Sequence, residues 1–286
     1  MQHGPVVRRR KLGAELRALR TTAGITSGEA ARLVGWHQSK VSRIETGTSG
    51  AKPSDVRLLL DAYGVHDDQL RGLLVMLARS DDAGGRPHWW HAYRGVLPPT
   101  YRDFISLESQ AGAMRTLETT VVPGLLQTPE YAREVTRAAA DGMPEERLDA
   151  LVEVRLARQD VLRGDPPLEL SAVLDEAVLR RQVGGPGVMA RQLERLVEEA
   201  RLPHVRLQVL PFAAGAHIGV TGPFVIFSFS STSDLDVVVL DHLTSSLHLE
   251  RKEDLEAYTE AFNALLIHAL SPEDSLDFIA AIAAGA

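Results

Sequence analysis

Residues 35–47, GWHQSKVSRIETG, decide the fold of the N-terminal part of this chain. Val41 and Ile44 lie three positions apart in this stretch, so they share one face of a helix, and glycines stand at both ends. The pattern predicts a short helix over residues 37–45 that is buried on the side of these two residues. Its polar side chains then point outward, either into water or toward a partner.

The flanking segments predict more short helices. Leucines at i, i+4 and i+7 predict a helix over residues 8–23. Thr26 is followed three residues later by Glu29, a capping box that opens a second helix. Two further helices are expected, one opening at residues 52–55 and one over residues 67–78. We therefore predict an all-α helix-turn-helix bundle of five helices.

Charge is distributed unevenly along the chain. The net charge is −7 in total, but residues 1–60 carry eleven Lys and Arg against four acids. That segment is therefore +7, and the rest of the chain is −14. Such asymmetry suggests a basic module that meets polyanions, joined to an acidic part that does not.

The outward side chains of the predicted third helix suit base recognition. Gln38 and Ser42 are four residues apart, as are Ser39 and Arg43, so they form two adjacent rows. Gln pairs well with adenine, Arg with guanine, and Ser with either. We therefore predict that these four residues contact DNA bases, with His37 at the edge of the group.

Contacts to the DNA backbone are expected from cationic side chains and from the capped second helix, because both offer donors to phosphate. The predicted backbone contacts are Arg17, Thr26, Ser27, Lys40, Thr46 and Lys52.

The run SKVSRIETG at residues 39–47 resembles the S-x-V-S-R-I-E-x-G signature of XRE/Cro-like repressors. The resemblance covers about residues 10–75. It implies that Arg20 forms a structural ion pair with Glu45, which then does not read bases. In this family the second helix often opens with a Gln that braces the third helix and touches DNA. This chain has Ser27 there, which predicts a shortened or missing contact.

Beyond a linker predicted over residues 80–96, the pattern changes. Apolar β-branched and aromatic runs, separated by helical segments, predict a larger α+β domain over residues 97–286, after a helix-turn-helix domain over residues 1–79. The sheet is expected to be antiparallel or mixed. One long helix is predicted over residues 144–163.

Several motifs of this second domain resemble one group of regulators. They include VPGLLQTPEYA at residues 122–132, DEAVLR at residues 175–180 and QVLPF at residues 208–212. The group is that of actinobacterial XRE-type regulators similar to the developmental regulator WhiJ, called antitoxin-like. The resemblance implies that the domain binds a small cognate protein encoded nearby, or a ligand.

Other kinds of site are not indicated. The chain has no cysteine and no apolar run long enough to span a membrane, which fits a soluble, cytoplasmic protein. His88 and His91 have metal-like spacing without a third ligand, so no metal or other cofactor is expected. The glycine-rich stretch at residues 184–187 lacks the context of a nucleotide loop. The loop at residues 215–222 is a turn or a ligand gate. No catalytic residues are visible, so no enzyme is expected.

These observations predict a sequence-specific transcriptional regulator that binds operator DNA as a homodimer. A second domain would receive the regulatory signal. The alternative is an antitoxin-like protein whose main task is to bind its partner, with DNA binding for autoregulation. An enzyme with an appended DNA-binding module is the third interpretation.

Overall fold

The amphipathic segments of the N-terminal part form five helices around one apolar core within the described residues. Leu12 and Leu16 of the first helix and Val41 and Ile44 of the third are at most 2% exposed there. The helices are α1 (Pro5–Thr22), α2 (Ser27–Leu33), α3 (Gln38–Glu45), α4 (Pro53–Ala62) and α5 (Asp68–Leu77).

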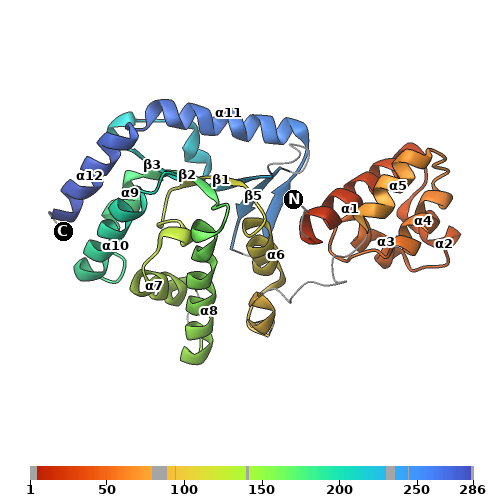
Figure 1. Ribbon diagram of the computed structural model, residues 1–286, viewed down its shortest axis with the longest axis horizontal. Helices are drawn as coiled ribbons and strands as arrows, with labels where there is room; N and C mark the ends of the chain where they lie inside the picture. The colour runs from red at the N-terminus through yellow and green to blue at the C-terminus, as the bar shows by residue number, and fades with distance from the viewer. Residues whose placement is uncertain are drawn as a thin grey trace. The chain divides into compact units, whose positions relative to one another are not determined.

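The chain divides into two compact units, Met1–His88 and Trp89–Ala286 (Figure 1). The computed structural model describes residues 5–78, 89–93, 95–139, 142–229, 236–243 and 245–284. Of the predicted linker, residues 80–88 and 94 lie outside the described residues. His88, one half of the metal-like pair, is among them.

The second unit is built on a six-stranded mixed sheet of order β3-β2-β1-β4-β5-β6. β1, β2 and β3 run parallel, whereas β4 and β5 pair antiparallel with their neighbours, as does β6 with β5. The predicted class, a helical bundle followed by a larger α+β domain, is confirmed. The strands are β1 (Ala113–Glu118), β2 (Glu169–Asp175), β3 (Val205–Leu210), β4 (Phe224–Ser228), β5 (Val237–Asp241) and β6 (Ser246–Leu249).

Helices cover both faces of this sheet (Figure 1). On one face, Phe262 and Leu265 of α11 pack on Leu117 of β1 and its neighbours. On the other, Phe104 of α6 meets Phe227 of β4 edge to face. The helices are α6 (Pro99–Glu108), α7 (Pro129–Ala139), α8 (Glu145–Ala157), α9 (Glu176–Arg180), α10 (Pro186–Glu199), α11 (Lys252–His268) and α12 (Pro272–Ala284).

Short 3-10 turns connect these elements. They are η1 (Trp89–Tyr93), η2 (Gly124–Leu126), η3 (Arg158–Arg163), η4 (Phe212–Ala214) and η5 (Ile218–Thr221).

The long helix predicted over residues 144–163 is wrong at its C-terminal end. α8 stops at Ala157, and the chain continues as the tighter η3. The change coincides with Arg158, whose buried guanidinium pairs with Glu108, so an internal charge pair and not a solvated face occupies this position. β6 and α9 were not predicted as elements; both are five residues or fewer.

No helix among the described residues is long and apolar enough to cross a membrane.

Candidate DNA-binding surface

α3 lies between two glycines with left-handed backbone, Gly35 at φ +70° and Gly47 at φ +67°. Only glycine adopts this conformation without strain, so the helix has sharp limits at both ends. Val41 and Ile44 anchor it in the core. The four residues predicted to read bases are all exposed and come from this one helix: Gln38, Ser39, Ser42 and Arg43. His37 is its exposed N-cap residue.

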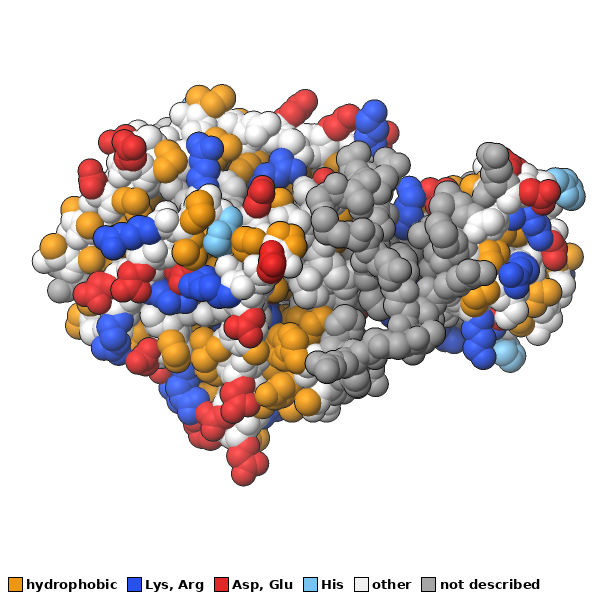
Figure 2. Space-filling view, viewed as in Figure 1, with side chains coloured by type: hydrophobic (Ala, Val, Ile, Leu, Met, Phe, Trp, Pro, Cys, Tyr) orange, Lys and Arg blue, Asp and Glu red, His pale blue; other side chains and the backbone are white. Residues whose placement is uncertain are grey.

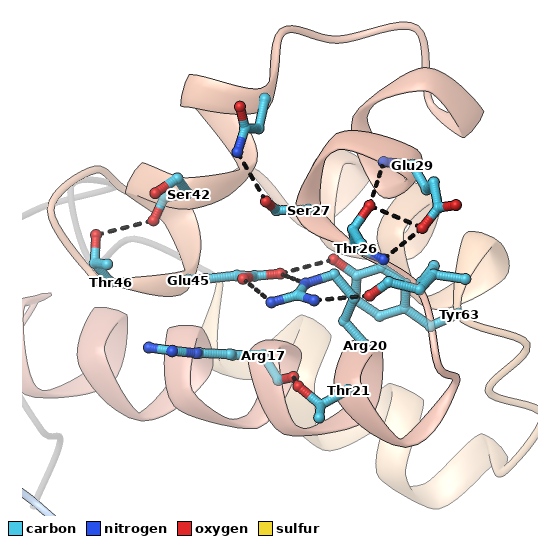
Figure 3. A network of polar contacts seen from close by, with 12 residues as sticks. Arg17, Arg20, Thr21, Thr26, Ser27, Glu29, Ser42, Glu45, Thr46 and Tyr63 are labelled. Atoms are coloured by element: carbon cyan, nitrogen blue, oxygen red, sulfur yellow. Dashed lines mark hydrogen bonds and ion pairs between the residues drawn. The ribbon is translucent and has the colours of Figure 1, made fainter.

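The N-terminus of α2 carries a complete capping box (Figure 3). The Thr26 hydroxyl accepts from the backbone N–H of Glu29 at 3.2 Å, and the Thr26 N–H donates to the Glu29 carboxylate at 2.7 Å. The hydrogen bonds that the Thr26 backbone N–H and hydroxyl donate to the Glu29 carboxylate lower the pKa of Glu29. The Thr26 hydroxyl also donates to Glu29 at 2.8 Å, so it is fully engaged within the helix.

Ser27 and Gln38 join α2 to α3. The Gln38 side-chain amide donates to the Ser27 hydroxyl at 3.1 Å. The sequence predicted that a serine at the start of α2 shortens or removes the contact that braces α3. A bracing contact is present, and the longer Gln38 side chain of α3 makes it by reaching the short Ser27 side chain. One Gln38 N–H and its carbonyl oxygen remain for another partner.

Arg20, Glu45 and Tyr63 form a buried network behind α3 (Figure 3). The Arg20 guanidinium donates twice to the Glu45 carboxylate, at 2.7 and 3.0 Å, and once to the Ile25 carbonyl at 2.8 Å. The Tyr63 hydroxyl donates to Glu45 at 3.2 Å. The hydrogen bond to Glu45 raises the pKa of Arg20, and burial raises the pKa of Tyr63. The network fixes the C-terminal end of α3 against α1 and α4.

Tyr63 was not singled out as a partner of Glu45 by the sequence. Tyr63 follows Leu59 by four residues, a spacing that indicates one shared buried face. That spacing reveals burial, but not the carboxylate that a buried hydroxyl needs as acceptor.

Lys40 is held by its own domain. Its ammonium lies 3.2 Å from the Asp55 carboxylate and 3.5 Å from the centre of the Trp36 ring. Both partners attract the cation, and neither was predicted. Lys40 therefore meets DNA only if it shares its charge with Asp55.

The remaining predicted backbone contacts are exposed. Arg17 lies on α1, and Lys52 precedes α4. The Thr46 hydroxyl donates to the Ser42 carbonyl at 2.9 Å (Figure 3). It also lies 2.8 Å from the Thr48 hydroxyl. All predicted contacts therefore lie on α1, α2 or α3, or in residues that directly precede or follow α2, α3 or α4.

The second unit has no comparable basic surface on the face drawn in Figure 2, where cationic and anionic side chains are interspersed. The most buried ion pair described in this unit joins Arg158 and Glu108. Arg158 donates to Glu108 at 2.8 and 2.7 Å and to the Tyr101 hydroxyl at 2.6 Å. Burial raises the pKa of Glu118 to about 7.

Two family models match the chain, one within each of its two compact units. A family model described as a Helix-turn-helix domain matches residues 11–74, and one described as a Domain of unknown function (DUF5753) matches residues 101–281. The second match spans well over half of the 286 residues. Searches of curated proteins and of solved structures find no match. The helix-turn-helix match supports a DNA-binding regulator.

Proposed function

We propose that this chain, which belongs to the family of the Domain of unknown function (DUF5753), is a sequence-specific DNA-binding transcriptional regulator. The observation that carries the proposal is the exposed polar face of α3. The Arg20–Glu45–Tyr63 network holds this helix against α1 and α4, and the capped α2 precedes it in the chain. A helix that presents such a face in a helix-turn-helix enters the major groove.

Base readout falls to the exposed residues of α3. Arg43 offers a bidentate fork to guanine, and Gln38 keeps one donor and one acceptor for adenine after its contact with Ser27. Ser39 and Ser42 add shorter hydroxyl contacts, and His37 lies at the edge.

Phosphate contacts come from residues around α3. Arg17 and Lys52 are exposed cations, and the exposed Thr46 hydroxyl would donate to a phosphate by turning its hydrogen away from the Ser42 carbonyl. At the start of α2 the Thr26 hydroxyl is engaged by Glu29, so the contact there is assigned to the Ser27 side and its backbone N–H. Lys40 contributes by sharing its charge between Asp55 and a phosphate.

The regulator acts as a homodimer of the XRE/Cro-like kind. One eight-residue helix reads too few base pairs for useful specificity, so two copies would bind half-sites about 34–36 Å apart, or a multiple of that. The second unit would set the dimer and receive the signal, as its resemblance to WhiJ-like regulators suggests.

A second candidate, an antitoxin-like role in binding a small protein, is favoured by one observation. Three large apolar side chains are exposed within nine residues of the loop after β3: Phe212 at 59%, Ile218 at 46% and Val220 at 77%. Exposed apolar groups gathered in this way are typical of protein interaction sites. Co-purification of a small protein that is lost in an Ile218→Ser, Val220→Ser variant would support this role.

Arg43→Ala tests the main proposal. With DNA selected by the wild-type protein, we expect affinity to fall by about 1–3 kcal/mol while affinity for random DNA changes less. The matched control is Arg32→Ala, which removes an exposed arginine of α2 and is expected to affect both DNAs little. An equal loss on selected and random DNA would contradict base reading by Arg43.

A further inference from the structure

The first turns of α1 carry a charge pattern that a helix by itself disfavours. Four consecutive cationic residues, RRRK at residues 8–11, stand near the N-terminus of α1, and its first turn has no acidic residue. Like charges repel, and the positive end of the helix dipole favours anions there. Residues 8–10 also precede the stretch that matches the helix-turn-helix family, residues 11–74. The pattern therefore calls for a reason outside the helix.

The same turns of α1 pack against the end of the recognition helix. A Cβ on Gly47 would lie 2.9 Å from the Arg10 Cα, and a Cβ on Gly50 would lie 3.5 Å from the Arg9 Cδ. Gly47 therefore lets Arg10 approach the turn that follows α3, and the Arg9 side chain lies in ordinary van der Waals range of Gly50. Farther along α1, a Cβ on Gly13 would lie 2.5 Å from the Ile44 carbonyl oxygen, so the contact is continuous.

The turn beside these arginines is also suited to an anion. Residues 46–54 contain no Asp or Glu, and Thr46, Thr48 and Lys52 are exposed in it. The Arg9 Nε is shielded from solvent and has no hydrogen-bond partner in the part of the chain that is described. Guanidinium groups beside a turn that contains no acidic residue match the acceptors of a phosphate.

We propose that Arg9 and Arg10 extend the phosphate contacts of the residue 46–52 turn into a strip along α1, which binds the DNA backbone beyond the bases read by α3. The inference rests on the proposed function, since it assigns a further contact to the same DNA. It explains why the cationic run is placed on a helix: α1 is packed on α3, so the strip has a fixed offset from the groove. Because phosphates are alike in all sequences, the strip adds affinity without specificity.

The experiment compares full-length variants on selected and random DNA over a range of salt concentrations. In Arg9→Gln, Arg10→Gln the slope of log affinity against log salt should fall by about 1.8, two contacts at about 0.9 each. Affinity should fall by the same factor on both DNAs. Arg9→Lys, Arg10→Lys keeps the charge and should keep most of the slope. The control Arg32→Gln removes an exposed charge from α2 and should leave the slope unchanged.

An unchanged slope in the Gln variant, or a loss confined to the selected DNA, would overturn the inference. Should that variant fail to fold, ethylation of single phosphates in DNA bound by the wild-type protein replaces it. Interference at phosphates outside the base-contacted segment is then expected, and its absence would overturn the strip equally. If the wild-type protein binds no DNA, the proposed function itself fails, which is a different result.

Discussion

Arg20→Ala tests how the recognition helix is held. The substitution removes two of the three donors to the Glu45 carboxylate, those at 2.7 and 3.0 Å, and leaves only the Tyr63 hydroxyl at 3.2 Å. The Glu45 side chain is 5% exposed in the wild type, so water is a poor replacement for the lost donors. Stranding one partner of a buried ion pair costs about 3–5 kcal/mol. We expect the lower end, about 3 kcal/mol, because Tyr63 remains.

The effect should come from the stranded charge and not from the lost attraction alone. In the triple variant Arg20→Met, Glu45→Leu, Tyr63→Phe, no charge of the network is left unpaired, and the Ile25 carbonyl is the group that loses a donor. Apolar replacement of a whole buried ionic network is often close to neutral. The triple variant should therefore be more stable than Arg20→Ala, although it carries more substitutions.

Hydrogen exchange of the α1 and α3 amides in the full-length chain, measured at increasing urea, reports the free energy of unfolding of this unit separately from the other. A loss below about 1 kcal/mol in Arg20→Ala would refute the reasoning. So would a triple variant less stable than the single one.

Three further changes test other contacts. Gly13→Ala should destabilise the first unit by about 1–3 kcal/mol in the same exchange measurement, because the new Cβ would lie 2.5 Å from the Ile44 carbonyl oxygen; an unchanged or raised stability contradicts this packing. Lys40→Ala should lower the free energy of unfolding by about 1 kcal/mol even without DNA, because the Asp55 and Trp36 contacts are lost. An unchanged stability together with weaker DNA binding would contradict a stabilising role for these two contacts. Glu118→Gln should change how stability depends on pH. The pKa of Glu118 is raised from 4.5 to about 7 in the folded chain, so its contribution is full below pH 4.5 and is lost as the pH rises through about 7. Between pH 5 and 8 the wild type should lose up to about 3 kcal/mol relative to the Gln variant in urea unfolding, and parallel pH curves would show that the pKa of Glu118 is not raised in the folded chain.

Features set by neighbours in sequence were predictable. The Thr26–Glu29 capping box needs only a spacing of three, and Val41 and Ile44 show the buried face of α3 by their periodicity. The strands β3, β4 and β5 were predictable from their own residues too, because runs of β-branched and aromatic side chains mark them.

Contacts across long separations were not predictable from composition or periodicity. Asp55 reaches Lys40 across 15 residues, and Tyr63 reaches Glu45 across 18. The Lys40 ammonium looks solvated in the sequence, and nothing in the sequence names an acceptor for the Tyr63 hydroxyl. The choice of partner depends on how α4 packs on α3. β6 escaped prediction because four residues with a serine and a histidine carry no strand signal, and pairing with β5 alone defines it.

The central claim is that α3 reads DNA sequence in a dimer, and selection from a random DNA library with the full-length chain tests it most directly. We predict enrichment of an inverted repeat whose half-sites are separated by one helical turn or a multiple of it, with one position of each half-site relaxed when Arg43→Ala is used. Recovery of no enriched sequence, or of the same repeat with every position unchanged in Arg43→Ala, would contradict the claim.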